Sequence, residues 1–146
     1  MKTILFDIDG TLADNWHRQH LVQAESPDWD SFFEMMSEDS QNVPVVELFK
    51  ALQESQKYRI ILVSARPERY RIQTESWLDS HDIVSEHLYM REDGDRRPDF
   101  KVKKDMLDKI LEDKHDIIFV VDDRTQTVKM WRENNITCLQ CADHDF

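Results

Sequence analysis

Glycine, proline and cysteine are scarce in this chain, which has two Gly, four Pro and two Cys among 146 residues. So few glycines and prolines argue against a collagen-like or low-complexity protein, and a hydrophobic content of 40% argues against a disordered one. Apolar runs of membrane-spanning length are missing, and the chain enters a strand pattern at once, which leaves no room for a signal peptide. We expect one soluble, cytoplasmic domain over residues 1–146 with no membrane partner.

The two cysteines form a single Cys-x-x-Cys pair, Cys138 and Cys141. A zinc site needs further ligands at suitable spacing, and His144 alone does not complete one. We therefore expect buried free thiols on a late strand rather than a metal or redox centre.

Basic residues are also in short supply, since 19 Lys and Arg stand against 30 Asp and Glu, for a net charge of −11. This balance argues against a broad basic face that binds nucleic acid through counterion release. It leaves room for a local contact with one terminal phosphate. Arg96 and Arg97 form a short basic pair that either contacts a nucleic-acid backbone or lies in an exposed loop.

The most informative segment is an apolar run that ends on two acids, Lys2–Thr11 (KTILFDIDGT). Side chains alternate along a strand, so Asp7 and Asp9 should point to one side of it. Gly10 allows the backbone to turn, and Thr11 adds a hydroxyl and an amide there. Two carboxylates at a strand end suit a hard cation such as Mg²⁺, or a nucleophile beside a proton donor.

Five segments have the character of strands: residues 3–8, 58–64, 87–90, 117–122 and 136–140. Two of them contain uninterrupted apolar runs, which are typical of strands covered on both faces of a parallel sheet. Helical patterns occupy residues 43–54, 67–80, 101–112 and 125–134, the second opened by Pro67. Alternating strands and helices predict an α/β fold with a doubly wound (Rossmann-like) parallel sheet.

Residues 14–42 do not fit this alternation. They contain Pro27 and several large apolar side chains among acids, namely Trp16, Trp29, Phe32, Phe33, Met35 and Met36. We expect two short helices that form a small helical cap inserted after the first strand. Most of the aromatic side chains should pack between this cap and the domain.

Binding and catalytic sites of doubly wound sheets form outside the carboxyl ends of the strands. Asp7 and Asp9 follow the first strand, Ser64 ends the second, and Asp122 and Asp123 end the strand at 117–122. The sequence therefore predicts that acids and a hydroxyl from three strand ends meet in one site.

These residues resemble, in order, the four motifs of the haloacid dehalogenase superfamily of phosphotransferases. Asp7–Thr11 resembles the first motif, Ser64 the second, a lysine of residues 101–112 the third, and the pair Asp122-Asp123 the fourth. The resemblance implies a phosphatase of this superfamily.

A closer resemblance, over nearly the whole chain, is to the 3′-phosphatase domain of bacteriophage polynucleotide kinase/phosphatases. The stretches that carry it are Val121–Arg132, Gly94–Arg97 with Asp99 and Lys103 following, Val63–Arg66, and the closing Asp145-Phe146. Arg18 matches an arginine that the family uses at its active site. Ala65 stands where the family usually has Gly, and residues 19–42 of the cap depart most, which leaves the substrate range open.

The resemblance implies a role for each site residue. Asp7 would attack phosphorus and form an aspartyl-phosphate, and Asp9 would protonate the leaving oxygen and later activate water. Ser64 and Lys103 would hydrogen-bond the transferring oxygens. A Mg²⁺ cofactor would be held by Asp7, the backbone carbonyl of Asp9, and Asp122 or Asp123. Residues expected to contact substrate phosphate or nucleic acid are Thr11, Arg18, Arg66, Arg97 and Asp99.

The lysine of the third motif has rivals on its own helix. Lys101 and Lys104 fit the motif by spacing alone, but the family places its lysine four residues after an acid, which here is Asp99. This spacing favours Lys103, and one helical turn would let Asp99 orient its ammonium group.

The expected function is that of a Mg²⁺-dependent polynucleotide 3′-phosphatase that acts on DNA or RNA ends in nucleic-acid repair. Its partner would be a nucleic-acid 3′ end. A phage-encoded enzyme of this kind would act in the cytoplasm of the host cell. These 146 residues contain no P-loop pattern, so they offer no kinase site. The alternatives are a 5′(3′)-deoxyribonucleotidase or other small-molecule phosphatase, and a catalytically silent binding module; the oligomeric state stays open.

Overall fold

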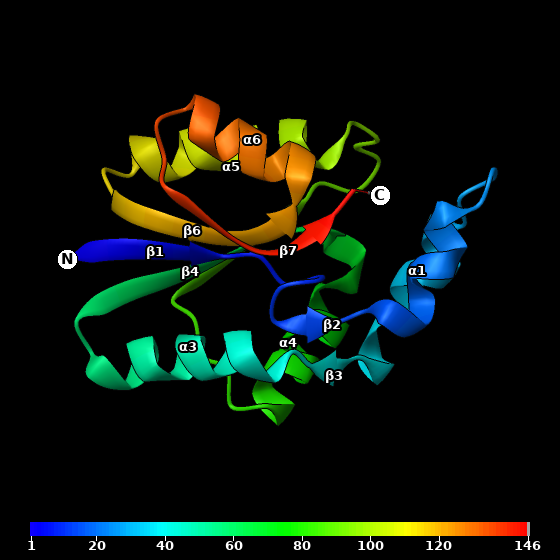
Figure 1. Cartoon of the computed structure of the whole chain (residues 1–146), viewed down its shortest axis with the longest axis horizontal. Helices are drawn as coiled ribbons and strands as arrows, with labels where there is room; N and C mark the ends of the chain where they lie inside the picture. The colour runs from blue at the N-terminus through cyan, green and yellow to red at the C-terminus, as the bar shows by residue number, and fades with distance from the viewer. Residues whose placement is uncertain (146) are drawn as a thin grey trace.

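The structure is a computed structural model, and it describes residues 1–145. Its centre is a five-stranded, all-parallel sheet with the strand order β5-β4-β1-β6-β7 (Figure 1). The strands are β1 (Lys2–Phe6), β4 (Tyr58–Pro67), β5 (His87–Arg91), β6 (Asp116–Arg124) and β7 (Cys138–His144). The predicted parallel α/β sheet is thus confirmed.

Helices cover both faces of the sheet, as Figure 1 shows. One face carries α5 (Asp99–Glu112) and α6 (Thr125–Glu133), and the other carries α3 (Val43–Ser55) and α4 (Arg71–Ser80). Between the two layers, Ile4, Leu5 and Phe6 of β1 have no exposed surface. Burial on both faces explains why the strands read as unbroken apolar runs.

Each face of the sheet has its own core, because side chains alternate along the strands. Leu5 packs with Met106 and Trp131 under α5 and α6. Phe6 packs on the opposite side, where its ring centroid lies 5.0 Å from that of Phe49 on α3. These cores fix the carboxyl ends of β1, β4 and β6 at a common edge of the sheet.

The first strand is shorter than predicted. It ends at Phe6, so Asp7 and Asp9 lie beyond it, just before a turn over residues 10–12. The carbonyl oxygen of Ile8 accepts hydrogen bonds from the amides of Thr11, Leu12 and Ala13, which hold that turn. As a result, the two acids contact different partners.

The helix predicted to open at Pro67 begins later. Pro67 still belongs to β4, Glu68–Tyr70 form the 3₁₀ turn η2, and α4 starts at Arg71. Proline tolerates the edge of a strand as well as the first turn of a helix, so its presence did not decide between them. β7 also runs further than predicted, to His144.

Residues 14–42 lie beyond the carboxyl ends of the strands (Figure 1). They form β2 (Ala13–Asp14), α1 (Trp16–Gln23), α2 (Trp29–Glu34), the 3₁₀ turn η1 (Met36–Glu38) and β3 (Ser40–Gln41), with β2 and β3 paired antiparallel. Phe32 and Phe33 are buried against Tyr70, whereas Trp16 is 73% exposed. This segment is called the cap below.

Two further expectations concern composition. Cys138 and Cys141 are free thiols on β7, as predicted, although only Cys138 is fully buried. Among residues 1–145, the helices all fall short of the length and apolarity that a membrane crossing requires.

Candidate active site

Lys103 joins the two strand ends that carry acids. Its ammonium Nζ lies 2.8 Å from Asp7 Oδ1 and 2.9 Å from Asp122 Oδ2, and all three side chains are buried. Burial alone would lower the pKa of Lys103, but Asp122 and Asp7 outweigh it and raise that pKa above its ordinary value. A permanent cation is thus fixed beside Asp7. The indole Nε1 of Trp131 donates to Asp122 Oδ2 at 3.1 Å and steadies the carboxylate.

Asp123 lies on the other side of Asp7. The Thr11 hydroxyl is 2.9 Å from Asp7 Oδ2 and 3.1 Å from Asp123 Oδ1, so it bridges the two carboxylates. Burial raises the pKa of Asp123 to about 6, and Asp122 adds to this effect. The pKa of Asp7 is also raised, by burial first and then by Asp122 and Asp123, against the opposing charge of Lys103.

Asp7, Asp122 and Asp123 can hold a metal ion. One carboxylate oxygen of each lies within 4.8 Å of the others, and all three residues are buried. Hard oxygen donors of this kind are what Mg²⁺ prefers. The raised pKa values of Asp7 and Asp123 show that the single ammonium of Lys103 does not neutralise the cluster, so the donor set fits a divalent cation.

Gly10 is the close neighbour of this cluster. Its φ is +80°, and a Cβ atom there would lie 2.1 Å from Asp123 Oδ2. His144, on the last strand, contacts the same carboxylate oxygen through Nδ1. The sequence did not indicate this contact, because the two residues are 21 positions apart and share no local pattern.

Asp9 faces two arginines. Arg66 Nε and Nη2 donate to its two oxygens at 3.0 and 2.8 Å, and Arg18 Nη2 also donates to Oδ1. Burial would raise the pKa of Asp9, but the guanidinium groups of Arg66 and Arg18 hold it well below its usual range. Arg18 is in turn held by Asp39, through Nε to Oδ1 at 2.8 Å and Nη2 to Oδ2 at 2.6 Å.

Both arginines are fully buried, so their geometry differs from the expected phosphate contacts. Arg18 and Arg66 hold Asp9 in place, and neither lines the adjoining cavity. Asp39 had no distinguishing signal in the sequence, because it is one of many acids in the cap. Ser64 is also buried and does not line the cavity. Its hydroxyl accepts a hydrogen bond from the backbone amide of Arg66 at 3.1 Å.

Of the three candidate lysines on this helix, Lys103 lies at the site, whereas Lys101 and Lys104 do not. Lys101 is exposed, and Lys104 pairs with Asp108 at 2.5 Å. The expected contact between Asp99 and Lys103 is wrong, because the buried ammonium points toward the strand ends.

Asp99 instead anchors the loop before α5. Its carboxylate pairs with Arg91, at 2.6 Å, and with Arg124. Arg91 also donates to the carbonyl oxygens of Asp95, at 3.1 Å, and Arg97, at 2.7 Å. The sequence did not single out Arg91, yet this side chain fixes the loop at residues 94–98.

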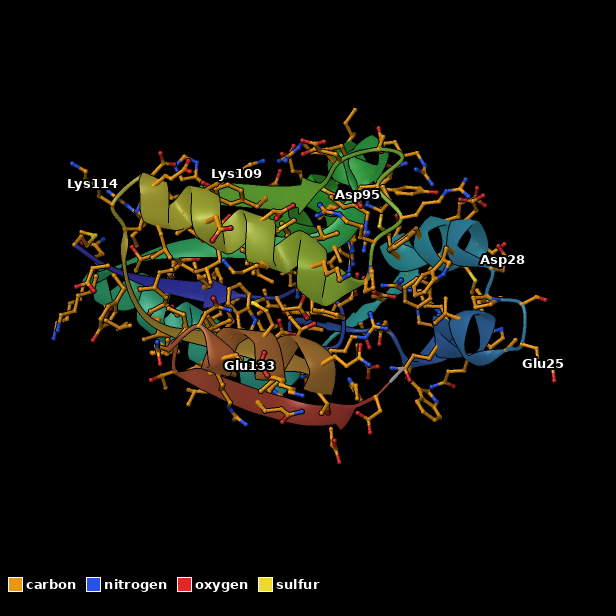
Figure 2. The ribbon with its side chains drawn as sticks, turned by 90° about the horizontal axis from the view of Figure 1, so that it is seen from above. Glu25, Asp28, Asp95, Lys109, Lys114 and Glu133 are labelled. Atoms are coloured by element: carbon orange, nitrogen blue, oxygen red, sulfur yellow. The ribbon has the colours of Figure 1, made fainter. Side chains whose placement is uncertain are left out.

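A cavity of about 690 Å³ opens above the acids. Asp7, Asp9, Asp123 and Lys103 form part of its floor, the cap supplies Trp29 and other residues on one side, and residues 94–100 supply the other. Two residues of the lining are labelled in Figure 2, Asp28 on the cap and Asp95 on the loop before α5. Arg69 links the two sides, since Nη2 lies 3.0 Å from Asp30 Oδ1 and its amide donates to Asp93.

Two buried polar atoms of the cavity wall have no protein partner among the described residues. They are Asn15 Nδ2 and Thr127 Oγ1. Burying such groups costs free energy unless they are hydrogen-bonded. Both residues line the cavity, but the two polar atoms themselves have almost no exposed surface.

A parallel sheet capped at its carboxyl edge, with carboxylates from two strand ends around a buried lysine, defines a phosphatase of the haloacid dehalogenase type. The chain belongs, more narrowly, to the family described as the polynucleotide kinase PNKP phosphatase domain, whose model matches residues 1–146. It is therefore a phosphoric monoester hydrolase.

Relatives are longer proteins. A protein of Autographa californica nuclear polyhedrosis virus, named for polynucleotide kinase and RNA ligase activities, is 27% identical over 146 residues, which are 99% of this chain and 20% of that protein. A chain of the Pnkp1/Rnl/Hen1 RNA repair complex is 33% identical, with a TM-score of 0.82, and the match covers 99% of this chain and 43% of the other. The chain thus spans less than half the length of either relative.

More distant structures share the fold alone. A Clostridium difficile protein described as a phosphatase has a TM-score of 0.68 at 18% identity, over 95% of this chain and 84% of that one. Its likeness supports the α/β architecture and says nothing about the substrate.

Proposed function

We propose that this chain is a Mg²⁺-dependent phosphatase that removes terminal 3′-phosphates from polynucleotides during end repair. The single observation that carries the proposal is the joining of Asp7, Lys103 and Asp122 at the floor of an accessible cavity, in a chain of the PNKP phosphatase family.

Asp7 is suited to attack phosphorus. Its Oδ1 is paired with Lys103 and its Oδ2 with the Thr11 hydroxyl, so the carboxylate is held in one orientation beside a fixed cation. Attack would form an Asp7–phosphate bond as the bond to the leaving sugar oxygen breaks. Lys103 would stabilise the charge on the transferring oxygens, which is the main task of a protein in phosphoryl transfer.

Asp9 is suited to proton transfer. The two arginines fix its carboxylate, which is 20% exposed, at the cavity floor. An anionic phosphate beside Asp9 raises its pKa, because like charge disfavours the ionised form. Asp9 can then give a proton to the leaving oxygen and take one from the water that cleaves the Asp7–phosphate bond.

A bound Mg²⁺ would be held by Asp7, Asp122 or Asp123, and the backbone carbonyl of Asp9, and it would neutralise charge between carboxylate and phosphate. The chain's own residues prepare the site for it. Thr11, Gly10 and Trp131 hold the carboxylates close together despite their repulsion.

The cavity supports a nucleotide end as substrate. Trp29 lines it, is 40% exposed, and is stacked on Phe33 with ring centroids 6.0 Å apart. Bases stack on such aromatic surfaces without strong sequence preference. Arg69, Arg96 and Arg97 lie in the wall, where they can contact phosphate oxygens.

The experiment measures phosphate release from a 3′-phosphorylated oligonucleotide, the same oligonucleotide phosphorylated at its 5′ end, and free nucleotides, with and without Mg²⁺. Asp7→Asn serves as the catalytic blank. Asp79→Asn, the same chemical change at an exposed position on α4, is the matched control and should leave activity unchanged.

We expect Mg²⁺-dependent release from the 3′-phosphorylated oligonucleotide above all. A preference for free nucleotides would favour a deoxyribonucleotidase, which the net charge of −11 supports. Release from none of the substrates would contradict the assignment of Asp7 and favour a binding module.

A further inference from the structure

A groove of about 580 Å³ runs between α5 and α6. Figure 2 shows these helices side by side, with the cap beyond one end. The charged residues of the groove are Arg97, Lys101, Lys104 and Lys129, against Asp105 and Glu133. In a chain with a net charge of −11, the residues that line the groove thus carry more positive than negative charge, although Arg97 is paired with Asp95 and Asp105.

The lysines of this groove can exchange their present partners for phosphates. Lys104 pairs with Asp108, and Lys129 lies 3.8 Å from Glu133. Both ion pairs lie at the surface, where water and salt screen them and their free energy is small. A polyanion can therefore displace the carboxylates at little cost.

The groove is continuous with the catalytic cavity. Arg97, Phe100 and Gln126 line both hollows. Next to Gln126, in the first turn of α6, Thr127 also lines the cavity, which brings the start of this helix to both hollows.

The side of the cavity that the cap forms is acidic. The cap, residues 14–42, contains seven acidic residues and one basic residue, Arg18, which is buried and paired with Asp9 and Asp39. Asp28 and Asp30 of the cap line the cavity itself. A nucleic-acid backbone is repelled from this side and attracted to the other.

We propose that the polynucleotide leading to the 3′ end lies in the groove between α5 and α6, with its backbone phosphates bound by Lys101, Lys104 and Lys129. The inference rests on the proposed function and adds the path of the substrate. It also gives the enzyme a reason to prefer long substrates over free nucleotides, since a mononucleotide ends within the cavity.

The test compares the wild type with Lys101→Glu/Lys104→Glu/Lys129→Glu. A matched control, Lys2→Glu/Lys57→Glu/Lys109→Glu, makes the same change in net charge away from the groove; Figure 2 shows Lys109 at the end of α5 distant from the cap. Substrates are a long 3′-phosphorylated oligonucleotide, a 3′-phosphorylated dinucleotide and p-nitrophenyl phosphate. KM and kcat are measured over a range of salt concentrations.

We expect the groove variant to raise KM for the long substrate by about tenfold or more and to reduce the slope of log KM against log salt by about two, since a single strand contributes about 0.7 per phosphate contact. Its kinetics on the dinucleotide and p-nitrophenyl phosphate should match those of the control, which shows that the catalytic site is intact. An unchanged KM on the long substrate, or an equal loss on all three, would overturn the groove while leaving the phosphatase in place. A wild type that hydrolyses no 3′-phosphorylated oligonucleotide would overturn the proposed function instead.

Discussion

Arg66 donates hydrogen bonds to both oxygens of the Asp9 carboxylate, with Nε 3.0 Å from Oδ2 and Nη2 2.8 Å from Oδ1. The two residues are 57 positions apart, and the guanidinium is fully buried. This forked contact fixes both the position and the direction of the group proposed to transfer protons. A point charge at the same place would fix only the position.

Arg66→Lys should therefore lower kcat by about 100-fold, because loss of the fork misplaces Asp9. It should also cost about 2 kcal/mol of unfolding free energy, since a buried carboxylate loses part of its pairing. Arg71→Lys is the matched control, because Arg71 makes a similar fork with Glu68, at 2.8 and 2.8 Å, on a partly exposed helix. Urea unfolding and steady-state kinetics check both effects.

The cost of Arg66→Lys should depend on pH. The pKa of Asp9 is lowered in the folded protein, so its pairing stabilises above the unfolded pKa of about 4 and is lost as the pH falls below it. The difference in stability between wild type and variant should shrink between pH 5 and pH 3, to be followed by urea unfolding across this range. A difference that grows in acid would contradict the ionised, arginine-held state of Asp9.

Mg²⁺ and protons should compete at the acidic cluster. The pKa of Asp123 is raised to about 6 in the metal-free folded protein, so between about pH 4 and 6 this protein binds more protons than the unfolded chain. The contribution of Asp123 to the free energy of unfolding therefore increases as the pH falls from about 6 toward 4. We expect Mg²⁺ to raise Tm at pH 7 and to do so progressively less below pH 6.

Asp123→Asn isolates this effect. Without Mg²⁺ at pH 7, the variant should have the higher Tm, because a repelling carboxylate is gone. With Mg²⁺ the order should reverse, since the variant has lost a ligand. Thermal unfolding with and without the metal measures both, and an order that Mg²⁺ leaves unchanged would contradict the assignment of the cluster to a metal.

Gly10→Ala should disturb the same cluster. Alanine at φ +80° is strained by about 1 kcal/mol, and its Cβ would lie 2.1 Å from Asp123 Oδ2, so the carboxylate must move. Gly94→Ala is a close control, because Gly94 has φ +85° but nothing within 4 Å of the added Cβ. Gly10→Ala should lose more stability than Gly94→Ala, because the contact with Asp123 adds to the backbone strain, and only Gly10→Ala should need more Mg²⁺ for half-maximal activity, by about tenfold or more.

Trp29→Ala should raise KM for a 3′-phosphorylated oligonucleotide by about tenfold, since stacking of one base contributes about 1–3 kcal/mol. Trp16→Ala is the control, because Trp16 is 73% exposed and does not line the cavity. Neither change should affect hydrolysis of p-nitrophenyl phosphate, which has no base. An equal loss on both substrates would show that Trp29 supports the cap and does not contact the base.

The fold was predictable because its determinants are local. An apolar run buried on both sides, followed by a helical pattern, specifies a parallel sheet wherever it occurs along the chain. The acids of the site were also predictable, since Asp7 directly follows β1 and Asp122 and Asp123 are among the last residues of β6, and these strand ends must meet at one edge. Errors in the secondary structure were confined to boundaries such as Pro67, where local preferences are balanced.

The partners of those acids were not predictable in the same way. Three lysines on one helix satisfied the spacing, and only the packing of α5 on the sheet buries Lys103 beside Asp7 and leaves Lys101 exposed. The contact of Arg91 with Asp99 joins the end of β5 to the start of α5 and has no local pattern.

The sequence by itself thus determined the sheet, its helices and the acids at its carboxyl edge. Buried strands and their ends can be recognised from short apolar runs and the residues that follow them. The tertiary structure alone decided how charge is distributed around those acids. It gave Asp9 its two arginines, Asp123 its raised pKa, and the cavity a groove lined by lysines on one side and an acidic cap on the other. These are long-range electrostatic properties, which depend on residues brought together from distant parts of the chain.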